Sequence, residues 1–286
     1  MAWDRVIELS VGEQGTGLLM SDLNIDFSIE KTMSPSENTG KFIIYNAKNS
    51  TVQDILKKGN NVIFKAGYKD ESISTIFTGS IIQSIHSKQG VDTKCEIIAV
   101  GKSSKIELKR SNISISYGPN TLLSKPVRNI AALLGVVIHG EQNAQIRLPN
   151  GWVYAGSVNG AMRYINEILN TNDCSMYVDN DEIVIYKNGQ PSRFNIVYLT
   201  YTGGLIFVKD ITEAEIKDEK GGKKRKPKKK VKKRVGFETI MISQLQPNAP
   251  VVFDTPNLKG NFIIEKLKFE GNNYGGNYGV KGEAFI

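Results

Sequence analysis

LNIDFSIE, at residues 23–30, alternates apolar and polar side chains without a break. Leu23, Ile25, Phe27 and Ile29 fall on one face, and the polar residues between them fall on the other. Successive side chains of a strand point to opposite faces of a sheet, so this period of two predicts a half-buried β-strand. The fold is therefore expected to begin with a β-sheet.

The residues that follow, up to residue 100, predict further strands and one short helix. A polar turn at 33–40 leads into a strand at 41–46, and more strands are expected at 61–68 and 76–82. The helix is expected at 49–59, where a polar N-cap precedes an aliphatic face and a glycine ends the segment. The sheet is thus assembled before any candidate for chemistry appears.

Several short motifs follow one another in this region in a fixed order. They are Glu30-Lys31-Thr32, Ser34-Pro35 with Asn38-Thr39, Ile44-Tyr45-Asn46, Val62 with Ala66-Gly67-Tyr68, and Phe77 with Gly79. The order continues near the C-terminus with segments at 242–248 and 260–267, a glycine-rich turn at 271–276 and a last strand at 278–285. Taken together, this set resembles the baseplate hub proteins of long-tailed bacteriophages.

The middle of the chain has a different character, typical of a small α/β module. Ser124-Lys125-Pro126 begins a short helix that stops at Gly135, and Ser157 is a plausible N-cap for a longer one. A strand is expected at 136–138, and two more at 175–178 and 182–186 form a hairpin. The carboxylates in that hairpin, Asp179, Asp181 and Glu182, favour turn formation over acid–base chemistry.

One segment holds all of the basic excess of the chain. Between residues 223 and 234 there are ten basic residues and no acidic one, and removing them from the net charge of +8 leaves −2 for the rest. Such a run repels itself and cannot pack a core, so we expect a solvated loop. It either has no specific role or contacts a protein partner, a nucleic acid or an anionic membrane. The possible contact residues are Lys223, Lys224, Arg225, Lys226, Lys228, Lys229, Lys230, Lys232, Lys233 and Arg234.

Residues suited to catalysis or metal binding are sparse. His86, expected at the end of a strand, and His139, expected just after one, have no neighbour at metal-ligand spacing, and no nucleophile elbow or phosphate-binding loop occurs. Cys95 and Cys174 are interpreted as buried reduced thiols, with a disulfide or a metal site as the alternatives. We therefore expect no enzyme, cofactor or small-molecule substrate. No apolar run is long enough for a signal peptide or a bilayer span, so synthesis in the host cytoplasm is expected.

The resemblance implies a mainly β fold of the α+β kind. Two domains similar to the tail-tube fold, each a β-barrel or sandwich, are expected at 1–108 and 191–286. The α/β module at 109–190 would lie between them, and a basic hairpin loop at about 217–235 would belong to the second domain. The two β-rich halves would share a fold, with Ile81-Ile82 in one matching Ile263-Ile264 in the other.

The resemblance also implies a structural role in the virion. In the family, three chains form a ring of six tube-like domains at the distal end of the tail tube. That ring adapts the six-fold tube to a three-fold central spike or fibre and lines the genome channel. The implied partners are two further copies of the chain, the tail tube protein, a spike or tail fibre protein, and passing genomic DNA.

The alternative function is that of a basic nucleic-acid-binding protein acting through residues 223–234. The mildly acidic remainder of the chain argues against it. So does the absence of any aromatic residue from that run, because proteins that stack bases interleave aromatic and basic side chains.

Overall fold

The computed structural model describes eight ranges of the chain: 4–12, 17–33, 38–55, 60–69, 73–101, 112–193, 195–212 and 233–286. The end of the expected helix, part of the turn at 33–40 and most of the basic run lie outside these ranges. No helix within the described part is long and apolar enough to cross a membrane.

The first third of the chain is a set of antiparallel strands with one short helix. Its elements are β1 (Arg5–Gly12), β2 (Leu18–Met20), β3 (Ile25–Thr32), β4 (Thr39–Tyr45), α1 (Asn49–Ile55), β5 (Asn61–Tyr68), β6 (Ser74–Gln89) and β7 (Asp92–Gly101). In β3, Ile25, Phe27 and Ile29 are buried and the residues between them are not, which confirms the alternation expected there. His86 lies inside β6, so the expectation that it ends a strand was wrong.

The middle of the chain forms a module with two α-helices. Its elements are β8 (Asn112–Tyr117), β9 (Thr121–Leu122), α3 (Ser124–Leu134), β10 (Val137–His139), a 3₁₀ turn (Glu141–Ala144), β11 (Arg147–Leu148), β12 (Trp152–Ser157), α4 (Val158–Thr171), β13 (Cys174–Asp179) and β14 (Glu182–Lys187). Both predicted helix boundaries are confirmed. Ser157 caps α4 by accepting a hydrogen bond from the amide of Gly160, and Gly135 ends α3 with φ 64°, a left-handed conformation that favours glycine.

The last third returns to strands. It contains β15 (Val197–Leu199), β16 (Leu205–Asp210), β17 (Arg234–Ile240), β18 (Pro250–Asp254), β19 (Lys259–Asn272) and β20 (Tyr278–Phe285). The described chain is thus mainly β, as the sequence predicts. The domain boundaries expected at 108 and 190 remain a prediction.

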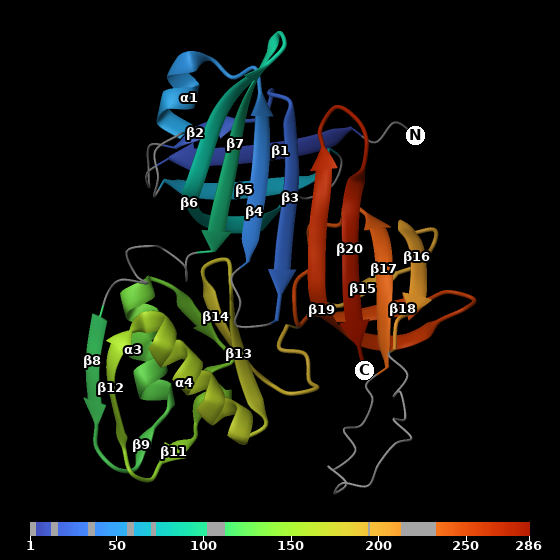
Figure 1. Ribbon diagram of the computed structural model, residues 1–286. Coiled ribbons are helices and arrows are strands. Elements are labelled where there is room, and N and C mark those ends of the chain that lie inside the picture. Colours follow the sequence, from blue (N-terminus) through green and yellow to red (C-terminus); the bar gives the residue numbers. More distant parts are fainter. Residues whose placement is uncertain are drawn as a thin grey trace, which may run out of the picture.

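The strands β1–β7 and the strands β15–β20, which we call the first and second halves, are joined in one sheet. The strand order is β16-β17-β20-β19-β3-β4-β7-β6-β5-β1-β2, and β3 pairs with β19 at the junction. Both halves contribute to a single cluster of buried apolar residues, while the module has a cluster of its own. Figure 1 shows the halves side by side, with the module below the first half. The shared sheet therefore holds the halves in a fixed arrangement.

The two halves repeat the same topology. In the first, five strands in chain order β3 to β7 lie in the spatial order β3-β4-β7-β6-β5. In the second, β16 to β20 lie in the order β16-β17-β20-β19-β18. Only the strand beyond this unit differs, because β1 pairs antiparallel with β5 whereas β15 pairs parallel with β18. The expectation that 236–286 is built from strands agrees with this order.

A β-bulge fixes which residues of the halves are equivalent. In β6 the extra residue is Ile82, which follows Ile81 opposite Ala99; in β19 it is Glu265, which follows Ile264 opposite Ala284. The amide before each bulge also donates to the preceding segment, Ile81 to Asn60 and Ile264 to Ala249, both at 3.0 Å. Ile81 therefore corresponds to Ile264. The expected match between the two Ile-Ile pairs was wrong by one residue.

Candidate assembly surfaces

β6 has an edge that no described strand covers. Its first part pairs with β5 up to Ser80, whereas its last part, 85–89, pairs with β7 alone among the described strands. In the second half, the equivalent part of β19 pairs with β3 over Lys266–Asn272. Ile85 lies on this part of β6 and is 45% exposed. An uncovered edge of this kind is a template for pairing with another strand.

β16 presents the matching edge. It ends the strand order and holds in the second half the place that β3 holds in the first. Within the described chain, only β17 covers it. Ile206 and Phe207 on this strand are 55% and 39% exposed. Figure 1 shows β6 and β16 at opposite sides of the molecule, so the two edges cannot satisfy each other within one chain.

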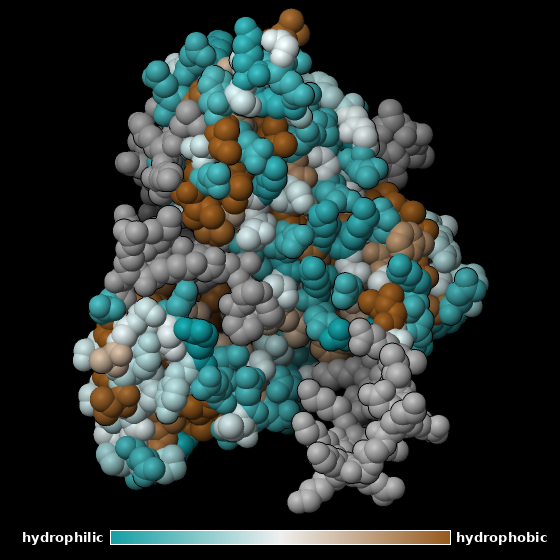
Figure 2. Space-filling model, viewed as in Figure 1, coloured by the Kyte–Doolittle hydropathy of each residue, from teal (hydrophilic) through white to brown (hydrophobic). Residues whose placement is uncertain are grey.

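The joined sheet has an outer face that does not pack on the core, formed by the residues that alternate with the buried ones. Figure 2 shows hydrophilic side chains across the middle of this face, where β3, β19 and β20 run. Lys41 on β4 and Glu96 on β7 form an ion pair of 2.9 Å across the strands. Glu270 on β19 bonds Lys268 and, across the strands, Lys281. These donors lower the pKa of Glu270 below its ordinary value.

A buried ion pair joins the module to the first half. Lys31 of β3 contacts the Asp179 carboxylate at the tip of the β13–β14 hairpin at 2.8 Å, and neither side chain is more than 1% exposed. The same ammonium donates to the carbonyl of Ile76 at 3.0 Å, and the Asn38 amide donates to the same carboxylate oxygen at 3.1 Å. Two charges are thus removed from water together with the hydrogen bonds that compensate them.

The hairpin tip makes further polar contacts around this pair. Arg193 lies 3.5 Å from the second Asp179 oxygen and 3.0 Å from Glu182, and the amide of Thr78 donates to Asn180 at 3.1 Å. The predicted turn is confirmed, because Asp179 pairs with Glu182 across two residues and Asn180 has φ 52°. The interpretation of Asp179 as only a turn residue was incomplete. One signal in the sequence could have predicted this ion pair: Lys31 falls on the buried face of the alternating strand.

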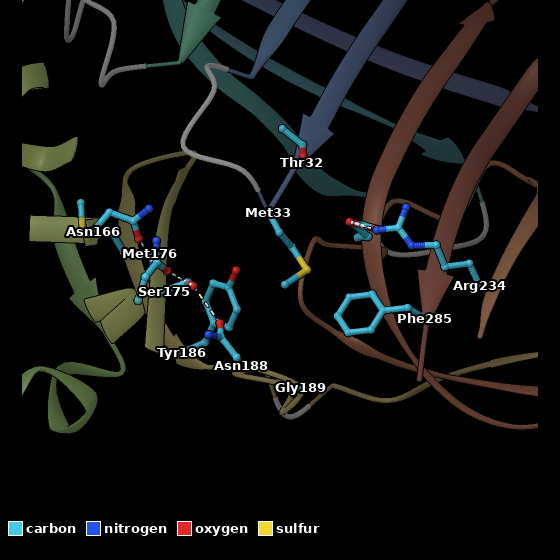
Figure 3. A pocket seen from close by; sticks show the side chains of 12 residues that line it. Thr32, Met33, Asn166, Ser175, Met176, Tyr186, Asn188, Gly189, Arg234 and Phe285 are labelled. Atoms are coloured by element: carbon cyan, nitrogen blue, oxygen red, sulfur yellow. Dashed lines mark hydrogen bonds and ion pairs between the residues drawn. The ribbon is translucent and has the colours of Figure 1, made fainter. Parts of the chain in front are cut away.

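The hairpin also reaches the second half. The Tyr177 hydroxyl donates to the carbonyl of Pro247 at 2.8 Å, and burial raises the pKa of this phenol. Beside it, Met33 just after β3, Tyr186 of the module and Phe285 of β20 belong to one buried apolar cluster. Figure 3 shows the cavity of about 330 Å³ at this three-way junction. The module is therefore bonded to both halves.

The basic run connects two paired strands. β16 and β17 are antiparallel neighbours with Val208 opposite Phe237, so the chain leaves and re-enters the sheet at one end. Eight of the ten basic residues lie outside the described residues. Lys233 is exposed, and Arg234 is not part of a loop: it begins β17 and contacts Glu265 at 2.8 Å. Its inclusion among the loop residues therefore needs correction, and the contact role of the run remains a prediction.

The remaining candidates for chemistry have structural surroundings. Cys95 and Cys174 are both buried and free, in line with their interpretation as buried thiols, and burial raises the pKa of Cys95 to about 11. His139 Nε2 lies 2.8 Å from the carbonyl oxygen of Ser192. Within the part of the chain that the structure describes, no group of three His, Cys, Asp or Glu side chains is placed to hold a metal ion.

Comparison with known proteins identifies the fold and the family. The tail protein of Neisseria meningitidis MC58 is 10% identical, with a TM-score of 0.65 over 98% of this chain and 96% of the other. The 43 kDa tail protein of prophage MuSo2 from Shewanella oneidensis is 8% identical, with a TM-score of 0.64 over 98% and 97%. A component of the type VI secretion system of E. coli, c3393, is 9% identical, with a TM-score of 0.59 over 96% and 76%. That protein is structurally similar to the T4 bacteriophage tail proteins gp27 and gp5.

No curated protein matches the chain significantly. The family model for baseplate hub gp41 matches residues 8–217, which is most of the sequence. This family consists of structural baseplate hub proteins of phage tails, so the protein is structural and not an enzyme. The chain belongs to the baseplate hub gp41 family, and it is a component of the phage tail.

Proposed function

We propose that three copies of the chain close into a ring at the distal end of the tail tube. The observation that carries this proposal is the repeated five-strand unit, which gives each chain two copies of one topology. Three chains then supply six similar units in alternation. Such a ring matches a six-fold tube on one side and, because the module occurs once per chain, a three-fold spike or fibre on the other.

The edges of β6 and β16 that no second described strand covers supply the contact that closes the ring. Within the chain, β3 of the first half pairs with β19 of the second. Their topological equivalents are β16 and β6, which lie at opposite sides of the molecule. Pairing β16 of one copy with β6 of the next repeats the contact already made inside the chain. The interface is heterologous, as a closed ring requires.

The repeat also fixes the register of this contact. Glu30 lies opposite Lys268 in the β3–β19 pair. Lys268 is three residues beyond the bulge in β19, and Ile85 is three residues beyond the bulge in β6. In the partner strands β3 and β16, Phe27 and Val208 are equivalent, because they lie opposite the equivalent residues Phe42 and Phe237. The residues three positions further on are Glu30 and Ile211, so Ile211 is expected opposite Ile85 of the next copy.

This register accounts for apolar side chains on both edges. Ile85, which is 45% exposed in the single chain, meets the aliphatic Ile211 of its neighbour. The amide of Ile211 donates to the carbonyl of Arg234 at 2.9 Å and so points toward β17. The pair with Ile85 is therefore non-hydrogen-bonded across the new interface, and in such pairs the side chains lie closest together.

The ring places the chain between the tail tube protein and a central spike or tail fibre protein, and its lumen becomes part of the genome channel. The protein is made in the host cytoplasm and resides in the baseplate of the virion. We assign to the basic run, now Lys223–Lys233, contact with a polyanion or with an acidic patch on a tail protein, because of its charge alone.

A disulfide cross-link tests the ring and its register together. The variant with Ile85→Cys and Ile211→Cys is expected to form a covalent trimer under mild oxidation, visible on a non-reducing gel, because directly opposed strand positions meet disulfide geometry. The two native thiols are buried and should not interfere. The matched control pairs Ile85→Cys with Lys209→Cys, two residues along β16, where the distance is too great.

Light scattering on the unmodified chain complements this test. A mass of three chains together with a covalent trimer only in the first variant supports the proposal. A monomer at every concentration, or a cross-linked trimer only in the control, contradicts it.

A further inference from the structure

We propose that the outer face of the joined sheet is a charge-compensated wall, built to let a polyanion pass without binding it. The inference rests on the ring proposed above and adds that this face turns toward its lumen. It concerns the partner of that face, which is double-stranded nucleic acid. It predicts weak contact in spite of many exposed lysines.

The face is densely charged but nearly balanced. Its members follow from the strand register, because they alternate with residues packed on the core. Over β3, β4, β7, β16, β17, β19 and β20, seven acidic and seven basic side chains of the described residues point outward. They are Asp26, Glu30, Asp92, Glu96, Glu238, Glu270, Glu283, Lys41, Lys94, Lys209, Arg234, Lys266, Lys268 and Lys281. The basic excess of the chain lies elsewhere, in the run at 223–233.

The balance is also local, because opposite charges meet across neighbouring strands. Glu238, Lys281, Lys268 and Glu30 follow one another in a row across β17, β20, β19 and β3. In the next row, Glu283 lies opposite Lys266. Each end of the first row carries an acid and its middle carries two bases. A phosphate that approaches any of these ammonium groups therefore approaches a carboxylate as well.

The ion pairs show that oppositely charged side chains on this face do contact one another. Lys41 and Glu96 are 2.9 Å apart, and their side chains are 49% and 30% exposed. Glu270 accepts from both Lys268 and Lys281. On the same face, the Tyr45 hydroxyl donates to Asp26 at 2.7 Å, and the Lys94 ammonium lies 5.3 Å from the Tyr45 ring centre. These contacts compensate charged groups at both the first and the second half.

The physical reason for pairing lies in how DNA binds cations. A protein that neutralises phosphates releases condensed counterions, so each free lysine adds affinity and steepens the dependence on salt. A ring presents every such lysine three times. Unpaired basic side chains would hold the duplex, and unpaired acidic side chains would repel it. Paired charges reduce both effects, because the field of each pair falls off faster than that of a single charge.

The test removes acids from the wall while leaving its lysines in place. The variant with Glu96→Gln and Glu270→Gln frees Lys41, Lys268 and Lys281 and keeps the shape of each side chain. The matched control is Glu8→Gln, which breaks an ion pair of similar exposure with Lys65, 3.2 Å apart on β1 and β5. Binding of a short fluorescent duplex to each full-length protein is measured by anisotropy over a series of salt concentrations.

The wall variant is expected to bind at least about tenfold more tightly than the unmodified protein at low salt, with a log–log salt slope steeper by about 2 to 5. The control should match the unmodified protein, because the basic run contributes equally to all three. Equal binding by the wall variant and the unmodified protein, both trimeric by light scattering, overturns the inference. So does an equal gain in the control, which would mean that net charge alone matters. Monomeric proteins overturn the ring itself.

Discussion

Replacing Asp179 with asparagine should lower the stability of the protein far more than this small chemical change suggests. The carboxylate holds the Lys31 ammonium at 2.8 Å, with both side chains at most 1% exposed. Asparagine keeps the shape but not the charge. The ammonium would then have only neutral acceptors, the carbonyl of Ile76 at 3.0 Å and the amide oxygen of the new side chain. A buried cation without a counter-charge is the costly product of this change.

The expected loss follows from that burial. Breaking a buried pair by removing one partner costs about 3–5 kcal/mol. For a chain of this size class, each kcal/mol lowers the melting temperature by about 2–4 °C, so a fall of roughly 10 °C is expected. Lys31→Met should cost less, because Asp179 keeps its hydrogen bond from Asn38 at 3.1 Å and Arg193 at 3.5 Å. Combining Lys31→Met with Asp179→Asn should recover part of the loss, since no unpaired charge then remains.

Urea unfolding followed by fluorescence, with thermal melting in parallel, measures these changes. Asp254→Asn is the control, because Asp254 also lies 2.8 Å from a lysine, Lys259, but on the surface, at 59% exposure. Its loss should stay within about 1 kcal/mol. If Asp179→Asn costs no more than this control, the pair does not hold the module in place and the reasoning fails.

Three further changes probe separate parts of the fold. Ser157→Ala removes the cap of α4 and should cost about 1 kcal/mol in urea unfolding, and Ser157→Asn should restore most of it; equal stability of all three would contradict the cap. The pKa of Glu270 is lowered in the fold, so its contribution is present above its ordinary pKa of 4.5 and is lost as the pH falls through the lowered value. Glu270→Gln should therefore be destabilising at neutral pH and equal to the unmodified protein in strong acid, and a gap that persists in acid would refute this. Deleting 219–232 should leave the melting temperature nearly unchanged, because only Val231 in that run has a sizeable apolar side chain, and should remove salt-dependent binding of polyanions. A deletion that unfolds the protein would show that the segment packs.

Local patterns in the sequence were enough to predict several elements, but not strands such as β1, β8 and β12. The alternation from Leu23 to Ile29, the cap at Ser157 and the stop at Gly135 act through neighbouring residues, and the structure confirms each one. The family resemblance added the repeat of two β-rich halves. The prediction from the sequence missed the equivalence of Ile81 and Ile264 by one residue. A β-bulge shifts the register, and short sequence motifs carry no sign of it.

The candidate surfaces depended on contacts that no local pattern encodes. Arg234 reads as the last residue of a basic run, but the pairing of β17 with β20 places it beside Glu265. The uncovered edges of β6 and β16 became visible only when the strand order of the two halves was compared.

By itself, the sequence determined a mainly β chain with two helices in its middle part, including the cap of one helix and the stop of the other, because period, caps and turn residues act over a few positions. The tertiary structure alone decided that the two halves share one sheet and that Lys31 meets Asp179. Those pairings join residues far apart in the chain. Their energy comes from burial and charge compensation, which exist only once the segments have met.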